Sequence, residues 1–307
     1  MLSQGAASQR LGGTSKSGVA LSFVLYVAAV FALAPLFAVV LHHGWMAAGA
    51  QPPPLHQLTA DALKWVALGA LIPWLRWHGR LNGEGLGLAC GGGAVKGVLV
   101  GGLVGLASIA FALVLAVLFD LREWRPNLTG AIVFEALWQS LLAGCLVALV
   151  EELWLRGAVQ GVLLALGRTF AIGFVAVVYA ALHFIRPDRA VDESEGWLDG
   201  YTALAGMFSR MGDPDNLDGF IALVGAGLVL GYLREKFGCI ASAVACHATW
   251  VCVIKLTRRT STLDVDAANL WLVSQYDGVI GWGFCLGLAL LAVALVCTTR
   301  ATCTRSL

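Results

Sequence analysis

Long apolar stretches recur along this chain, and they restrict its possible folds more than any other feature. Residues 19–41 contain no charged side chain, and a helix of about 20 apolar residues crosses the hydrocarbon core of a bilayer. Over the whole chain 59% of the residues are hydrophobic and 13% are charged. A soluble domain carries about 25% charged residues. The sequence therefore predicts an all-α, polytopic membrane protein.

The apolar stretches predict about eight transmembrane helices. They cover residues 19–41, 61–77, 94–119, 138–166, 170–185, 219–233, 238–256 and 279–296. We expect a disordered cytoplasmic tail at 1–18, one transmembrane helical domain at 19–299 and a short tail at 300–307. Lysine and arginine lie slightly more often in the loops on the N-terminal side, which favours cytoplasmic termini. The predicted location is the cell membrane, or the inner membrane of a Gram-negative bacterium.

Net charge and cysteine spacing exclude several classes of function. A net charge of +1 gives no reason to expect a nucleic-acid partner. The eight cysteines include no Cys-x-x-Cys pair, so neither a zinc site nor a disulfide framework is indicated. We interpret them as small packing residues.

Glycines mark one face of the stretch 94–119. Gly93, Gly97, Gly101 and Gly105 follow one another at intervals of four residues. Such a stripe lets the backbone of a neighbouring helix approach closely. We expect close helix packing here, and the alternative is a groove for a substrate chain.

Three ionisable residues lie inside the apolar stretch 138–166. Glu151 and Glu152 are adjacent, and Arg156 follows Glu152 by four residues. Ionisable groups are costly within a membrane and need partners there. On a helix Glu152 and Arg156 share one face, whereas Glu151 is rotated by about 100°. The spacing predicts that Glu152 neutralises the arginine and that Glu151 points elsewhere.

Two histidines are predicted to lie at the depth of these carboxylates. With a rise of about 1.5 Å per residue, His183 and His247 fall within about one helical turn of Glu151. A carboxylate and an imidazole around one water can deprotonate it for attack on a carbonyl. The same residues could bind zinc, but Arg156 would repel the cation, so we expect neither metal nor cofactor. A purely structural ion-pair network is the other alternative.

These residues carry a resemblance to a known family. Glu151-Glu152-x-x-x-Arg156-Gly157, Tyr179-x-x-x-His183 and the segment 245–250 around His247 resemble, in order and spacing, the three motifs of the CPBP family. Its members are intramembrane glutamic endopeptidases related to the CAAX prenyl endopeptidase. The resemblance implies that Glu151 and His183 activate water, that Glu152 and Arg156 orient and charge-balance the site, and that His247 contributes to the oxyanion hole.

Two positions depart from the family pattern. Tyr179 stands where phenylalanine is usual, and Val251 stands where asparagine usually follows the histidine by four residues. Valine cannot donate a hydrogen bond, so one oxyanion donor is missing or replaced. We predict that the indole N–H of Trp250 replaces it.

The leading hypothesis is a metal-independent endopeptidase that cleaves a membrane-anchored protein or peptide, with a cleavage site near the C-terminus as one option. The alternative is a catalytically impaired membrane scaffold or immunity-type binding protein. A transporter is a third possibility, but the sequence contains no evident inverted repeat. The oligomeric state is not predicted.

Overall fold

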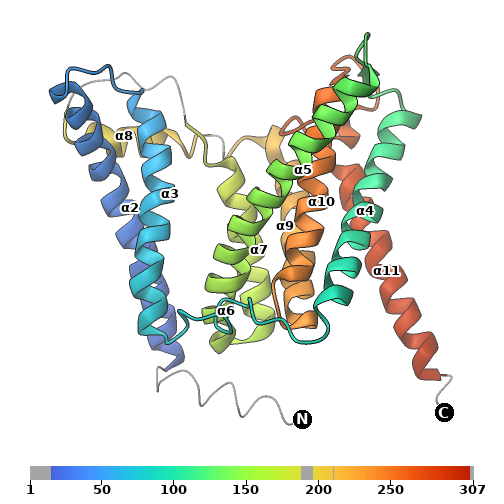
Figure 1. Cartoon of the computed structure of the whole chain (residues 1–307), viewed down its shortest axis with the longest axis horizontal. Helices are drawn as coiled ribbons and strands as arrows, with labels where there is room; N and C mark the ends of the chain where they lie inside the picture. The colour runs from blue at the N-terminus through green and yellow to red at the C-terminus, as the bar shows by residue number, and fades with distance from the viewer. Residues whose placement is uncertain (1–14, 188–195, 210, 305–307) are drawn as a thin grey trace. The chain divides into compact units, whose positions relative to one another are not determined.

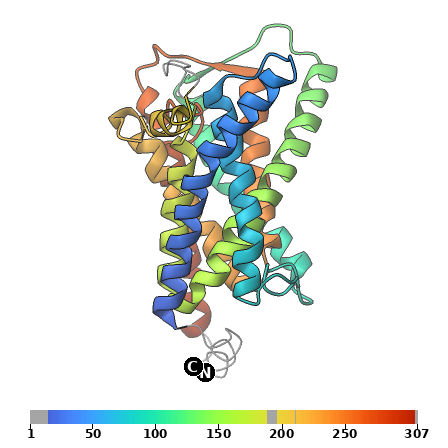
Figure 2. The same cartoon turned by 90° about the vertical axis from the view of Figure 1, so that its left-hand side faces the viewer.

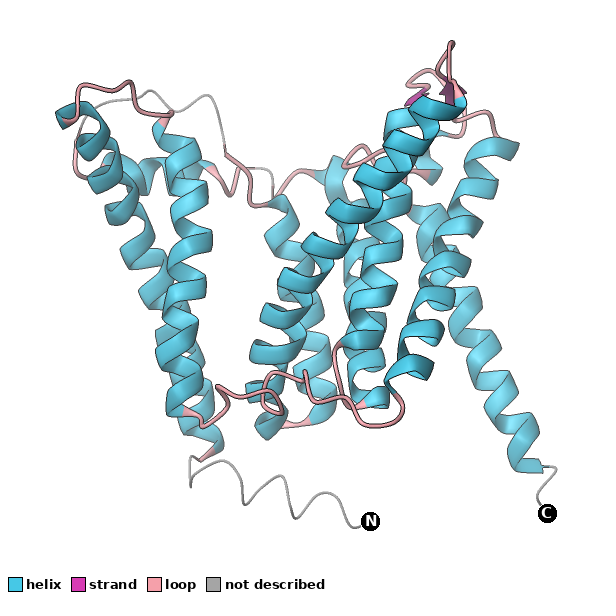
Figure 3. Ribbon diagram, in the orientation of Figure 1, coloured by secondary structure: helices cyan, strands magenta, loops and turns pink. Residues whose placement is uncertain are grey.

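The structure, a computed structural model, describes residues 15–187, 196–209 and 211–304, with side chains described as far as residue 293. Figure 3 shows that helices dominate these residues, beside a single pair of short strands in the described part. A helix lies at each of the eight predicted stretches: α2 (Lys16–Ala47), α3 (Leu55–Trp77), α4 (Ala94–Leu118), α5 (Gly130–Glu152), α7 (Arg168–Phe184), α9 (Leu217–Phe237), α10 (Ala241–Thr260) and α11 (Trp282–Thr304) (Figure 1).

Within the described residues, five helical segments are long and apolar enough to cross a membrane. They are Lys16–Ala47, Leu55–Trp77, Ala94–Leu118, Gly130–Leu166 and Pro214–Phe237. The chain is therefore an all-α polytopic membrane protein, as predicted, while the count of eight spans stays a prediction. Helix α10 is absent from this set; it carries Lys255, Arg258 and Arg259 toward its end.

The ends of the helical region differ from the predicted boundaries. Helix α2 begins at Lys16, because the Ser15 hydroxyl accepts a hydrogen bond from the Gly18 N–H at 3.1 Å and caps the first turn. Residues 1–14 of the predicted tail lie outside the described residues. At the other end α11 continues to Thr304, into the predicted tail at 300–307, and residues 305–307 lie outside the described part.

The chain groups into two compact units, and the single transmembrane helical domain stays a prediction. Unit 1 consists of residues 1–86, 158–171 and 181–213, and unit 2 of residues 87–157, 172–180 and 214–307. Helix α7 contributes residues to both units. Each unit has its own packing, described separately below.

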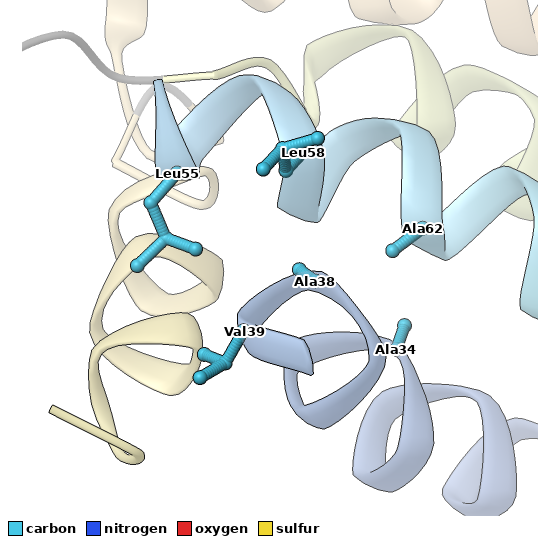
Figure 4. Close-up of a cluster of buried hydrophobic side chains, with 6 residues drawn as sticks. All are labelled: Ala34, Ala38, Val39, Leu55, Leu58 and Ala62. Carbon is cyan, nitrogen blue, oxygen red and sulfur yellow. The ribbon is translucent and has the colours of Figure 1, made fainter. Parts of the chain in front are cut away.

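Unit 1 is built around the pair α2 and α3, which lie side by side (Figure 2). Their contact includes small side chains, so the two backbones can approach closely. Figure 4 shows this cluster: Ala34, Ala38, Val39, Leu55, Leu58 and Ala62. The short helix α8 (Asp199–Gly206) packs on both helices, and the Tyr201 hydroxyl fixes it by donating to the Ala32 carbonyl at 2.7 Å.

Unit 2 is organised around α10, which packs against α4, α5 and α9. Glycines set two of these contacts. A Cβ on Gly101 or Gly105 of α4 would lie 2.0 Å from the Ser242 carbonyl oxygen or 2.7 Å from the Cys246 carbonyl oxygen. A Cβ on Gly144 of α5 would lie 2.7 Å from the Ala248 carbonyl oxygen. Close packing of the glycine stripe is thus confirmed at Gly101 and Gly105, and Gly144 of α5 provides a second close contact to α10.

Two strands extend unit 2 beyond its helices. Strands β1 (Arg122–Trp124) and β2 (Ser261–Leu263) pair antiparallel, with Glu123 opposite Thr262. The Arg122 side chain donates to the Ser261 hydroxyl at 2.8 Å and to the Gly278 carbonyl at 2.6 Å. The pair therefore joins the end of α10 to the loop that leads into α11.

The interpretation of all eight cysteines as packing residues is wrong for two of them. Cys90 and Cys239 form a disulfide, with their Cα atoms 5.3 Å apart. The bond connects the loop before α4 to the turn between α9 and α10. Because 149 residues separate the two cysteines, no local spacing could have indicated the pair.

Candidate active site

Glu152 is the centre of a buried polar cluster in unit 2. One of its oxygens, Oε1, accepts hydrogen bonds from Arg156 Nη1 and from His247 Nδ1, each at 2.9 Å. Both members of the Glu152–Arg156 pair are fully buried, and His247 is 3% exposed. The ion pair is thus removed from solvent, and it joins the end of α5 to α10.

Glu151 differs from Glu152 in its exposure. Its side chain is 32% exposed, and its Oε2 atom lies 3.9 Å from His247 Nε2. It therefore stands beside the same imidazole as Glu152 but on the accessible side. This is the division of roles expected for adjacent residues on a helix, with one carboxylate in an ion pair and the other open to a reactant.

The backbone changes conformation immediately after the two glutamates. The prediction was a single helix across 138–166, but residues Leu153–Val159 form a π-helix, η1. It is followed by α6 (Gln160–Leu163) and the 3₁₀ turn η2 (Leu164–Leu166). A π-helical turn contains an extra residue, which redirects the side chains that follow, and such turns are frequent at functional sites. Arg156 lies within this turn.

Tyr179 of α7 packs against the Arg156 guanidinium. The guanidinium carbon of Arg156 lies 4.4 Å from the centre of the Tyr179 ring, a distance typical of cation–π contacts. The Tyr179 hydroxyl lies 3.5 Å from His247 Nε2, and the residue is 3% exposed. A residue considered in the sequence only as an aromatic exchange therefore contacts both the arginine and the histidine of the cluster.

A close contact between α7 and α9 holds Tyr179 in position. A Cβ on Gly227 of α9 would lie 2.7 Å from the Cα and 2.9 Å from the Cβ of Ala176 on α7. The Gly227 carbonyl also accepts a hydrogen bond from Arg156 Nη2 at 3.5 Å. Glycine at this position thus allows the approach that brings Tyr179 and Arg156 together.

Gly227→Ala is expected to destabilise the protein by about 1–3 kcal/mol, because the added methyl group must push α7 away from α9. Thermal unfolding of the purified protein in detergent measures the effect. Gly173→Ala is the matched control on α7, since nothing lies within 4 Å of its added Cβ. It should stabilise the helix by up to about 1 kcal/mol. Equal behaviour of the two variants would contradict the role given to Gly227.

The two residues that follow His247 by three and four positions do not offer a donor to the cluster. The Trp250 indole N–H donates to the Ser108 hydroxyl of α4 at 2.9 Å, and the Trp250 ring packs edge-on against Phe284. Val251 carries no polar side-chain atom. The Trp250 N–H, which was predicted to act as an oxyanion donor, therefore already donates a hydrogen bond to a side chain of α4.

Four of the five predicted catalytic residues meet in unit 2: Glu151, Glu152, Arg156 and His247. The fifth, His183, lies on the last turn of α7 and belongs to unit 1. The chemistry available within unit 2 is that of an accessible carboxylate next to an imidazole, beside a buried ion pair.

A comparison with protein families finds one related group. The family model described as type II CAAX prenyl endopeptidase Rce1-like matches residues 133–253, less than half of the chain. The matched segment contains all the polar residues of the cluster. Neither the curated proteins nor the solved structures contain a match to this chain.

Proposed function

We propose that this protein is an intramembrane endopeptidase in which Glu151 activates water, since residues 133–253 match the family model of Rce1-like type II CAAX prenyl endopeptidases. The observation that carries the proposal is the difference between two adjacent carboxylates. Glu152 is fully buried in an ion pair, whereas Glu151 is 32% exposed beside an imidazole. A general base must reach a reactant, and Glu151 is the carboxylate that can.

In the proposed reaction, water attacks the carbonyl carbon of the scissile peptide bond and Glu151 takes the proton of that water. The resulting tetrahedral oxyanion collapses, the C–N bond breaks, and the same proton passes to the leaving amine. Glu152 and Arg156 fix the position of His247, which lines the oxyanion site. By the family resemblance, His183 is the residue proposed to assist Glu151.

The proposed substrate is a membrane-anchored protein or peptide cleaved near its C-terminus, with prenylated CAAX proteins as the first class to test. The experiment compares the C-termini of membrane proteins from cells with and without this chain by mass spectrometry. A parallel assay supplies the purified protein with a synthetic peptide ending in an S-farnesylated CAAX sequence. Loss of the C-terminal residues in either assay supports the proposal, and intact C-termini in both contradict it.

A membrane scaffold or immunity-type binding protein is the second candidate, and Val251 favours it by lacking an oxyanion donor. The ion pair favours the enzyme. Among the described residues, Glu152 Oε2 and Arg156 Nε are buried without a hydrogen-bond partner. A buried pair that is incompletely satisfied contributes little net stability, so packing alone explains the cluster poorly.

The disulfide bears on the predicted orientation in the membrane. Both α2 and α3 are long enough to span, so the loop that holds Cys90 shares a side with the N-terminus. Disulfides persist in oxidising compartments and are rare in the cytosol. The Cys90–Cys239 bond therefore supports an N-terminus outside the cytoplasm, opposite to the orientation expected from the basic residues.

In a variant that retains only Cys90 and Cys239, we expect a membrane-impermeant maleimide to label intact cells only after mild reduction. The reductant opens the disulfide, and the thiol of Cys90, the less buried of the two cysteines, can then react with the reagent. Gel shifts of the labelled protein, with and without reductant, provide the measurement. Labelling that requires cell lysis would instead support the cytoplasmic orientation, and labelling of intact cells without reductant would contradict the disulfide.

A further inference from the structure

The hydrogen bonding of His247 determines which of its nitrogens can donate. Glu152 Oε1 is a carboxylate oxygen and can only accept, so His247 Nδ1, 2.9 Å away, carries the hydrogen. In the neutral imidazole Nε2 is then an acceptor. A neutral His247 therefore cannot donate through Nε2 to an oxyanion, and the oxyanion site requires a donor from another side chain.

The Tyr179 hydroxyl is a hydrogen-bond donor that lies close to His247 Nε2. It is 3.5 Å from His247 Nε2, and the same nitrogen is 3.9 Å from Glu151 Oε2. The phenol, the imidazole and the proposed base thus converge on one position. With Nε2 as the acceptor, the Tyr179 O–H is placed to donate to it.

The Tyr179 ring is held on two sides, so its hydroxyl is preorganised. Arg156 lies over one face at 4.4 Å from the ring centre. The His247 ring meets Tyr179 edge-on, with 5.8 Å between ring centres and an interplanar angle of 87°. A donor fixed before the reaction stabilises developing charge without reorganisation during the step.

We propose that Tyr179 supplies the hydrogen bond that stabilises the oxyanion of the tetrahedral intermediate. This inference rests on the proposed endopeptidase function. As charge develops on the substrate oxygen, only the hydroxyl hydrogen of Tyr179 reorients, from His247 Nε2 to that oxygen, while the ring stays in place. The phenol keeps its proton throughout, so the proton transfer through Glu151 is unchanged. Tyr179 takes the role for which Val251 has no polar atom and Trp250 has no free N–H.

Tyr179→Phe should lower kcat on the farnesylated peptide by about 10²–10³-fold, the usual effect of losing one oxyanion donor. KM should stay nearly constant, because a donor used only in the transition state does not bind the ground state. A hydrated difluoromethyl ketone analogue of the peptide mimics the tetrahedral intermediate. Its affinity should fall by a similar factor, whereas the affinity for the cleaved peptide should not change.

Tyr26→Phe is the matched control, since it also removes the hydroxyl of a buried tyrosine, one that donates to the Ala67 carbonyl at 3.0 Å within unit 1. It should change the melting temperature but neither kcat nor the affinity for the ketone. If the wild-type protein cleaves the peptide and Tyr179→Phe retains its kcat, or loses the affinities for ketone and product alike, the Tyr179 assignment is wrong and the endopeptidase stands. A wild-type protein that cleaves nothing overturns both.

Discussion

Glu151→Gln is expected to abolish detectable cleavage while the protein still inserts and folds. Glutamine has nearly the same shape as glutamate but cannot accept the proton of the attacking water. Loss of a general base typically lowers the rate by about 10²–10⁴-fold. The fold should tolerate the change, because the Glu151 side chain is 32% exposed and its Oε2 atom lies 3.9 Å from His247 Nε2. The measurements are kcat on the farnesylated peptide and the melting temperature in detergent.

Glu135→Gln provides the matched control for this prediction. It makes the same substitution on the same helix, at an exposed residue that accepts a hydrogen bond from Gln139 Nε2 at 2.8 Å. Cleavage should remain at the wild-type level. Wild-type activity in Glu151→Gln would assign the base to another group. If no cleavage is found and Glu151→Gln preserves a partner phenotype that Glu152→Gln abolishes by unfolding the protein, the scaffold is the better explanation.

The parts of the site that follow from helix periodicity could be predicted from the sequence. Glu152 and Arg156 are one turn apart, and the structure pairs them at 2.9 Å. His247 was placed near Glu151 by counting residues from the helix ends, and the two side chains do lie side by side in unit 2. Local spacing and membrane depth are both properties of single helices, so the sequence contains them.

The parts that depend on contacts between helices could not be predicted. Nothing near Trp250 in the sequence indicates that its indole N–H donates to Ser108 on another helix. The position of Tyr179 depends on the contact between Gly227 and Ala176. The π-helical turn after Glu152 could not be predicted either, since the apolar stretch 138–166 continues through it. These features arise from packing, which a single helix pattern does not determine.

Arg156→Met is expected to give the largest loss of stability among single substitutions in the cluster. The guanidinium is fully buried and pairs with the fully buried Glu152 carboxylate at 2.9 Å. Methionine fills much of the same volume but leaves Glu152 with His247 as its only charged or polar donor among the described side chains. Removing one member of a buried ion pair typically costs about 3–5 kcal/mol, because the remaining charge is uncompensated. Unfolding of the purified protein by titration with SDS measures this free energy.

Two further variants test whether the loss of stability comes from breaking the buried ion pair or from substituting any paired residue. The double variant Glu152→Gln/Arg156→Met removes both charges and should recover part of the lost stability, because a buried pair replaced as a whole is often nearly neutral. Lys64→Met breaks an exposed pair with Asp61, whose members are 70% and 61% exposed, and should cost less than about 1 kcal/mol. An Arg156→Met protein as stable as Lys64→Met would show that the buried pair is dispensable to the fold. The cluster would then be retained for chemistry alone, and loss of cleavage in Arg156→Met without loss of stability would point to a direct role of the guanidinium beside Tyr179 and His247.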